Sequence, residues 1–380
     1  MYLKYTGLIF FKFVVSKIIK MRNRQFAIFI ILFTLVVLYN SCQIFRNIEK
    51  GQPEYVIFPP PPDTARIQYL TSLSSSFDVV KKQSGFNKFI FGELPPSTIS
   101  KPYGLNLRYN KLYICDIGIG GIEIIDFFEH TFEYFMPTGK GQLRNPVNCY
   151  VDEKGKMYIA DSGRKQVVIF DKQKNYIDAI GDTAVFNPLD VFVSDNKIWI
   201  ANLESNKIEV FQNDSTKKFL YAFPQGAKIG DKAFLYQPRD IIVTNNEVYV
   251  CDFGGFDVKV FSLNGEFIRT VGSQGMHPGQ FARPKGIALD REENLYVTDA
   301  TFTNAQIFNK NGQVLMFFGT PEKDKYRGYM YMPACVAIDY ENVQYFEKFV
   351  DPIYKLKYLI FVANQYGTDK IHVYGSIELK

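Results

Sequence analysis

Histidine is scarce in this sequence of 380 residues, and the scarcity removes a class of function. The chain has only three histidines, His130, His277 and His372. They fall at different positions of the repeat described below, so they cannot converge on one metal ion without large distortion. The five cysteines form no CxxC pair, and no spacing indicates a nucleophile elbow or a Walker loop. The sequence therefore gives no support to a zinc enzyme, and we predict no catalytic residue and no metal ligand.

A large net charge is also absent from most of the chain. The formal net charge is +5, but the first 41 residues contain six basic side chains and no acidic one. Without these six the net charge is −1. A chain close to neutrality lacks the positive potential that attracts a phosphate backbone. We therefore expect no nucleic-acid partner.

Long apolar runs are limited to a segment near the N-terminus. From Met21 the chain reads MRNRQ, then 13 apolar residues (FAIFIILFTLVVL), then YNSC, which is the anatomy of a signal peptide. Thirteen residues are short of the roughly 20 that cross a bilayer. The ending resembles a lipoprotein signal, in which Cys42 would be lipidated, so we expect a signal peptide over residues 1–41 with Met21 as the start. An uncleaved anchor from about Phe26 to Tyr39 is the alternative.

The residues after this cysteine suggest where the protein resides. Gln43 follows it rather than Asp, and the resemblance to Gram-negative lipoproteins then implies an outer-membrane protein that faces the periplasm. Residues 42–65 would be a lipidated tether, stiffened by the four prolines 59–62. The membrane is thus an expected partner through the lipid anchor.

Aromatic residues and internal repetition are what the sequence has in excess. Phe, Tyr and Trp make up 16% of the chain, which favours strands. Six segments share a proline before an apolar strand, and a second strand with an aromatic residue three positions before an Asp or Asn. The prolines recur at a mean spacing of about 46 residues, the length of a propeller blade. They are Pro102, Pro146, Pro188, Pro238, Pro284 and Pro333.

The sixth copy lacks a fourth strand, because the chain ends soon after Tyr374. An unpaired strand, Arg66–Leu73, precedes the first copy. We expect it to become the outer strand of blade six, since this closure removes an exposed edge. The sequence thus predicts an all-β fold, a six-bladed β-propeller over residues 66–380 closed by an N-terminal outer strand.

The copies resemble NHL repeats. The clearest are PKGIALDREENLYVTD in the fifth copy and PVNCYVDEKGKMYIADSGRKQVVIF in the second. The resemblance covers residues 100–375 and, with the upstream FPPPPDTARIQYL, extends to a group of bacterial propeller lipoproteins. It implies a six-bladed propeller but no particular activity, because propellers host enzymes, sensors and scaffolds alike.

Asp or Asn ends the second strand of every copy, and this column resembles a ring of ligands. Its presence in all six copies favours a structural role instead, because Asx side chains accept backbone hydrogen bonds in turns. The column is Asp116, Asp161, Asn202, Asp252, Asp299 and Asn364.

A break in the repeat marks the candidate ligand site. NHL repeats favour Gly two residues after the proline, at the mouth of the central channel, but the second, third and fourth copies carry polar residues there. Cations stand one position earlier in the fourth and fifth copies. We therefore predict a ligand site at the channel mouth, with a solvated polar rim as the alternative. Its residues are Asn148, Asp190, Arg239, Asp240 and Lys285.

Two segments fall outside the repeat. Residues 77–92 have apolar residues at helical spacing and predict a short helix over the channel mouth. Residues 343–358 form an insertion in blade six on the opposite face, and its aromatic and lysine side chains suit a bilayer interface. A long hairpin with its own small hydrophobic cluster is the alternative. The aromatic residues are Tyr345, Phe346, Phe349, Tyr354 and Tyr358.

The cysteines at the strands are expected to be small buried hydrophobes. A disulfide between Cys115 and Cys149, on adjacent blades, is the alternative in an oxidising compartment.

We therefore expect a membrane-tethered, non-enzymatic binding or scaffold propeller without a cofactor. Its ligand would be a protein or a small polar molecule at the channel mouth. The alternative function is a calcium-dependent, lactonase-like hydrolase in the channel, since a calcium site needs only carboxylates and amides.

Overall fold

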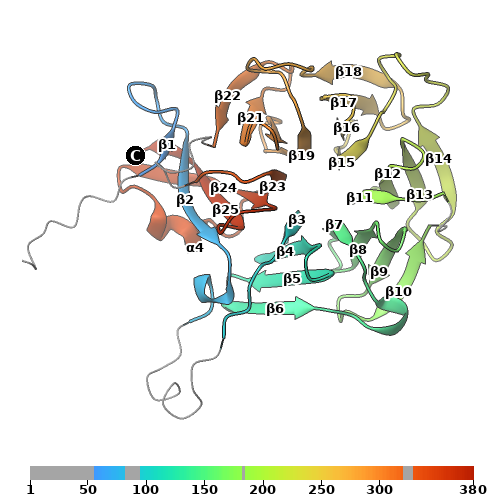
Figure 1. The fold of residues 1–380 in the computed structure, drawn as a ribbon, viewed down its shortest axis with the longest axis horizontal. Coiled ribbons are helices and arrows are strands. Elements are labelled where there is room, and N and C mark those ends of the chain that lie inside the picture. The colour runs from blue at the N-terminus through green and yellow to red at the C-terminus, as the bar shows by residue number, and fades with distance from the viewer. Residues whose placement is uncertain (1–54, 82–94, 182–184, 320–327) are drawn as a thin grey trace, which may run out of the picture. The chain divides into compact units, whose positions relative to one another are not determined.

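The computed structural model describes residues 55–81, 95–181, 185–319 and 328–380. In these residues six antiparallel sheets are arranged as blades around a central axis (Figure 1). The prediction of an all-β, six-bladed propeller is confirmed. The expected signal peptide, Cys42 and most of the expected tether lie outside the described residues.

Blades one to five each have four strands in sequence order. Blade one contains β3 (Pro102–Arg108), β4 (Lys111–Asp116), β5 (Gly121–Asp126) and β6 (Thr131–Phe135). Blade two contains β7 (Pro146–Val151), β8 (Met157–Asp161), β9 (Gln166–Phe170) and β10 (Tyr176–Ile180), and the 3-10 turn η2 (Gly139–Gly141) precedes it. Blade three contains β11 (Pro188–Ser194), β12 (Lys197–Asn202), β13 (Lys207–Gln212) and β14 (Phe219–Phe223). Blade four contains β15 (Pro238–Val243), β16 (Glu247–Asp252), β17 (Asp257–Ser262) and β18 (Phe267–Val271). Blade five contains β19 (Pro284–Leu289), β20 (Leu295–Asp299), β21 (Asn304–Phe308) and β22 (Val314–Phe318).

Blade six joins the two ends of the described chain. Its strands from the axis outward are β23 (Pro333–Asp339), β24 (Tyr354–Asn364), β25 (Ile371–Leu379), β2 (Ile67–Leu73) and β1 (Ile57–Phe58). The predicted closure by the N-terminal strand is confirmed, since β2 pairs with β25 from Ile67↔Ser376 to Leu73↔Ile371. The compact unit begins at Tyr55 rather than at residue 66, because β1 adds a fifth strand at the rim.

The Asp/Asn column holds each blade to the connector that precedes it. Asp161, for example, is fully buried and accepts hydrogen bonds from the backbone N–H groups of Arg144 and Asn145 at 2.7 and 3.0 Å. Asp299 accepts equivalent bonds from Ala282 and Arg283. These bonds satisfy backbone donors that would otherwise be buried unpaired. The structural interpretation of the column therefore fits the geometry.

Neighbouring inner strands approach one another so closely that two positions require glycine. A Cβ added at Gly104 would lie 2.5 Å from the carbonyl oxygen of Val147, and one added at Gly286 would lie 2.6 Å from the Cα of Cys335. Real Cβ contacts are longer than this, so a side chain at either position would push two blades apart.

Part of the blade-six insertion packs into the core of the propeller. It forms α4 (Val343–Phe346) and the 3-10 turn η3 (Glu347–Phe349). Phe346 is fully buried, and Tyr358 is buried in the interface with blade five. The other three insertion aromatics, Tyr345, Phe349 and Tyr354, are half-buried against the same core. Phe346 and Tyr358 are therefore unavailable to a bilayer, while a membrane contact of the three half-buried rings stays a prediction.

The insertion is also joined to the closing strand. The buried side chain of Gln68 donates to the carbonyl oxygen of Phe349 at 3.0 Å and accepts from the N–H of Asp351 at 3.1 Å. The start of β2 and the insertion thus lie on the same side of the blade.

The expected helix over residues 77–92 falls mostly outside the described residues. What precedes it is the 3-10 turn η1 (Ser76–Asp78). In the described part of the chain, no helix is both long and apolar enough to cross a membrane.

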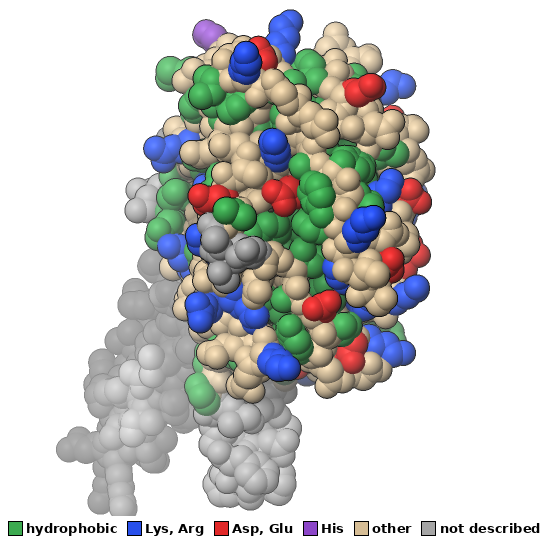
Figure 2. All heavy atoms as spheres, turned by 90° about the vertical axis from the view of Figure 1, so that its right-hand side faces the viewer, with side chains coloured by type: hydrophobic (Ala, Val, Ile, Leu, Met, Phe, Trp, Pro, Cys, Tyr) green, Lys and Arg blue, Asp and Glu red, His purple; other side chains and the backbone are tan. Residues whose placement is uncertain are grey.

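The rim of the propeller exposes edge strands. On β14, Phe219 and Leu220 are exposed, and Lys217 and Lys218 stand directly before them. Figure 2 shows this side of the ring, with hydrophobic side chains lying between basic and acidic ones. Charges beside an open edge oppose pairing with a second sheet.

Candidate functional site

The five predicted site residues lie together at the channel mouth, at the ends of the inner strands. Four of them, Asn148, Arg239, Asp240 and Lys285, line a pit of about 10 Å³ that Tyr103 also lines. Asp190 lies beside this pit and is bonded to two of its residues. The pit has room for one water molecule or one ligand oxygen.

The carboxylates at the mouth connect the blades. Asn148 donates from its amide to Asp190 Oδ1 at 2.7 Å, and Asp190 Oδ2 accepts from the backbone N–H of Ile241 in the next blade at 2.7 Å. Asp240 repeats the pattern one blade further on, accepting from the N–H of Ile287 at 2.9 Å. Three successive blades are thus joined near the axis.

These carboxylates are buried, so the mouth is not a solvated rim. Asp190 is 3% exposed and Asp240 is 8% exposed. Burial raises the pKa of both carboxyl groups, to about 6 for Asp240 and well above the usual range for Asp190, where the nearby Asp240 charge adds to the effect. A hydrogen bond joins the two groups. Burial and the neighbouring Asp240 charge thus favour the protonated form of Asp190.

The cations at the mouth have no such partner. Lys285 is only 8% exposed, and its ammonium donates to Gln365 Oε1 at 2.8 Å. Burial, together with repulsion from Arg239, Arg283 and Lys101, lowers the pKa of this ammonium to about 8. Among the described residues no carboxylate lies within ion-pair distance of any of these four cations.

Aromatic rings hold these cations in place. The Arg239 guanidinium lies 4.5 Å from the ring centroid of Phe253 and donates to the hydroxyl of Tyr103. Lys101 lies 5.0 Å from the ring of Tyr366, and Lys285 lies 6.0 Å from that of Tyr103. The buried Arg239 Nε has no hydrogen-bond partner within the described residues. Rings attract cations without neutralising them, so the mouth keeps its positive charge.

Sequence reasoning missed half of this cluster. Lys101 and Arg283 stand directly before the first and fifth column prolines, and Phe253 directly follows the column residue Asp252. A comparison of these two flanking positions across the six copies would have located them. The repeat pattern contains no signal that the side chains of Tyr103 and Gln365 point towards this cluster.

The other chemistry-bearing residues are dispersed. Within the described residues, no group of three or more His, Cys, Asp or Glu side chains is placed to hold a metal ion. His372 is buried in blade six, and this burial lowers its pKa to about 3. Cys115, Cys149, Cys251 and Cys335 are all buried and free. The expected burial of these cysteines is confirmed, and no disulfide joins Cys115 to Cys149.

Comparisons with known proteins agree with the fold. Residues 230–374, less than half of the chain, match a family described as 6-bladed beta-propeller. Protein brain tumor from Drosophila melanogaster is 25% identical over 126 residues. That match covers 33% of this chain and 11% of the relative, so the chain spans only a small part of the relative's length.

Two solved structures extend the likeness to most of the chain. A protein of unknown function from Bacteroides thetaiotaomicron aligns with a TM-score of 0.57 at 12% identity, covering 82% of this chain and 76% of that one. A catalytically inactive virginiamycin B lyase from Staphylococcus aureus, solved with quinupristin, aligns with a TM-score of 0.51 at 12% identity, covering 73% and 95%. At such identities the likeness concerns the fold alone.

Proposed function

We propose that this protein is a non-enzymatic binding propeller whose ligand presents an anionic group to the channel mouth. The observation that carries the proposal is the buried Lys285 ammonium, which lies among three further cations and has one neutral hydrogen-bond partner. A buried charge without a counter-charge is costly. A bound carboxylate or phosphate group would remove that cost.

The division of charges at the mouth supports an anion rather than a cation. The carboxylates of Asp190 and Asp240 are occupied by backbone N–H groups and by each other. The cations keep unused donors, since an ammonium has three and Lys285 uses one. One anionic oxygen would enter the pit, and the rest of the ligand would lie above it, against Phe253 and Tyr366.

The anionic group has two sources, a small free molecule or an acidic segment of a partner protein. Both present the same chemistry to Lys285 and Arg239. Nothing among the described residues favours the calcium-dependent hydrolase, since the mouth carboxylates already accept backbone N–H groups. We further propose that Cys42 carries the lipid that tethers the propeller to the outer membrane, facing the periplasm. In that case Cys42→Ala leaves unprocessed precursor.

Citrate and a hexaglutamate peptide are the probes that test the mouth. We expect saturable binding of at least one of them by calorimetry at pH 7. Its affinity should fall as the pH rises through 8, because deprotonation of Lys285 removes the attracting charge. Lys285→Met should weaken it at least tenfold, whereas Lys140→Gln, which changes an exposed lysine on a connector, should not.

The two probes also distinguish the sources. Binding of citrate alone indicates a small molecule, and binding of the peptide alone indicates a partner protein. Absence of saturable binding by both, or binding that Lys285→Met leaves unchanged, contradicts the proposal.

A further inference from the structure

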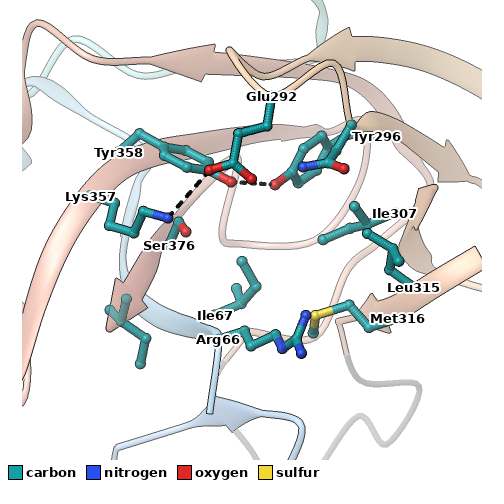
Figure 3. Close-up of a pocket in the computed structure, with 12 residues that line it drawn as sticks. Arg66, Ile67, Glu292, Tyr296, Ile307, Leu315, Met316, Lys357, Tyr358 and Ser376 are labelled. Atoms are coloured by element: carbon teal, nitrogen blue, oxygen red, sulfur yellow. Dashed lines mark hydrogen bonds and ion pairs between the residues drawn. The ribbon is translucent and has the colours of Figure 1, made fainter. Parts of the chain in front are cut away.

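A second cavity opens between blades five and six, away from the channel mouth. Its volume is about 250 Å³, just below the range of about 300–1,000 Å³ that is typical of drug-sized ligands. Blade five contributes residues from β20, β21, β22 and the β19–β20 turn, and blade six contributes residues from β2, β24 and β25 (Figure 3). We call this cavity the interblade cleft.

The inner wall of the cleft is a buried polar network. The hydroxyls of Tyr296 and Tyr358 lie 2.7 Å apart (Figure 3). The Tyr358 hydroxyl lies 3.1 Å from Asp290 Oδ2 and the Tyr296 hydroxyl 3.5 Å from it. Asp290 is itself fixed by the side chain and the backbone N–H of Asn294, at 2.9 Å each. Each phenol has one proton. One of these two protons bonds Asp290 and the other joins the two hydroxyls, so the network uses both. The phenol oxygens therefore offer lone pairs to the cleft, and a ligand group at this wall has to be a donor.

The outer part of the cleft carries positive charge. Lys357 is the extra residue of a β-bulge, because Leu356 pairs with Ile377 and Tyr358 with Ser376. A bulge redirects side chains, and bulges are frequent beside binding sites. The Lys357 ammonium lies 3.7 Å from Glu292 Oε1, a loose contact between exposed groups.

Arg66 lies on the opposite side of the cleft, at the start of β2 (Figure 3). It makes no ion pair with any described residue. With Lys357 and Glu292, the ionised residues of the lining sum to one net positive charge.

An apolar wall separates the tyrosines from Arg66. It is formed by Ile67 of β2, Ile307 of β21 and Met316 of β22. Ile67 and Ile307 are almost fully buried, so their contacts with the cleft are fixed by packing. A ligand that fits has an aliphatic part of a few carbons.

We propose that the interblade cleft binds a small aliphatic monocarboxylate that carries a hydroxyl or amino group. Its carboxylate pairs with Arg66, which can donate two parallel hydrogen bonds. Its aliphatic part lies against Ile67, Ile307 and Met316, and its hydroxyl or amino group donates to the oxygen of Tyr296. The site is independent of the channel mouth and shares no residue with it.

Such a ligand would also tighten the closure of the ring. It would contact β2, which closes the ring, together with β24 of the same blade and β20 of blade five. A ligand that binds only the closed form stabilises it by mass action. Hydrogen exchange of the β2 amides should therefore slow when the ligand is bound.

The test uses three probes with the full protein: 4-methylpentanoate, its neutral analogue 4-methylpentanamide, and 5-hydroxy-4-methylpentanoate, whose hydroxyl lies at the end of the chain away from the carboxylate. We expect the hydroxy acid to bind most tightly by calorimetry and the amide at least tenfold more weakly than 4-methylpentanoate. Arg66→Gln should weaken both acids at least tenfold. Tyr296→Phe should remove the advantage of the hydroxy acid and leave 4-methylpentanoate unchanged.

Matched controls keep the outcome interpretable. Lys355 is two residues from Lys357 and is not part of the cleft lining. The change Lys355→Gln should therefore leave the affinities for all three probes unchanged. Lys285→Met at the channel mouth should do the same, which separates this site from the proposed function. Lack of saturable binding by both acids, equal binding of acid and amide, or indifference to Arg66→Gln would each overturn the proposal. Unchanged exchange of the β2 amides in the bound protein would overturn the link to closure.

Discussion

The channel mouth and the interblade cleft differ in how much space the fold leaves between neighbouring blades. At the mouth the inner strands approach so closely that a Cβ at Gly104 would meet the Val147 carbonyl oxygen at 2.5 Å, and a pit of about 10 Å³ remains. Blades diverge with distance from the axis, and between blades five and six about 250 Å³ stays open. The carboxylates near the axis therefore become structural and leave room for a single ligand atom, while the wider cleft further out can hold a whole small molecule.

The cleft between blades four and five sharpens the comparison, because there a similar arrangement is already satisfied. Arg269 contacts both carboxylate oxygens of Glu247 and donates to the hydroxyl of Tyr249 at 3.1 Å. Blade five has Met316 at the position of Arg269, and the arginine of the next cleft, Arg66, comes from the blade-six side. Arg66 has no carboxylate within ion-pair distance among the described residues. The arginine is thus a structural contact in one cleft and an available donor in the other.

Removal of the closing strand should have the largest effect, because it destroys the cleft and opens the ring. Deletion of residues 43–74 exposes the hydrogen-bonding edge of β25 and the apolar core beneath β2. We expect aggregation, or a loss of several kcal/mol of the free energy of unfolding, measured by urea denaturation.

A shorter deletion is the control for this experiment. Removal of residues 43–54 leaves the compact unit from Tyr55 onward intact and should not change the melting temperature. A protein lacking residues 43–74 that melts like the full chain would contradict the role of closure.

Loss of both mouth carboxylates should rank second. The double change Asp190→Ala and Asp240→Ala leaves the N–H groups of Ile241 and Ile287 and the amide of Asn148 without acceptors. We expect a loss of about 3–5 kcal/mol in urea denaturation. A truly solvated rim would show a change below about 0.5 kcal/mol.

The pH dependence of stability separates charge from hydrogen bonding at the mouth. Because the folded-state pKa of Asp240 is raised to about 6, the folded protein keeps this proton while the unfolded chain loses it near pH 4. This group therefore lowers stability as the pH rises from about 4 to 6, by up to about 1.4 kcal/mol per pH unit. Asp240→Asn keeps the acceptor for Ile287 and should remove that slope. Identical slopes in the two proteins would rule out the raised pKa.

Replacement of the buried ammonium should have the smallest effect on folding, and in the opposite direction. Lys285→Met removes an ammonium group whose pKa is lowered to about 8 by burial and by neighbouring cations. We expect the ligand-free protein to gain about 1–2 kcal/mol in the free energy of unfolding at pH 7. The gain should shrink above pH 8, because wild-type Lys285 then becomes neutral in the folded state. A loss of stability at pH 7 would show that the protein itself neutralises Lys285.

Some of this molecule is determined by the sequence alone. The period of the proline and Asp/Asn columns establishes six blades, and the missing fourth strand of the last copy identifies Arg66–Leu73 as the closing strand. These are local or periodic signals, and each copy confirms the others. The break in the glycine column likewise identified residues that the fold brings together.

The tertiary structure alone decided what those residues do. Burial of Asp190 and Asp240, and the absence of a carboxylate within ion-pair distance of Lys285 among the described residues, depend on how closely the inner strands approach. The tertiary structure also decided that Phe346 and Tyr358 of the insertion are buried. The sequence could not decide this, because an aromatic composition that suits a membrane also suits a hydrophobic interior. The interblade cleft joins Arg66 to Tyr296, which lie far apart in the chain and belong to no common motif. A cavity is space that side chains leave unfilled, and only the packed chain determines where that space lies.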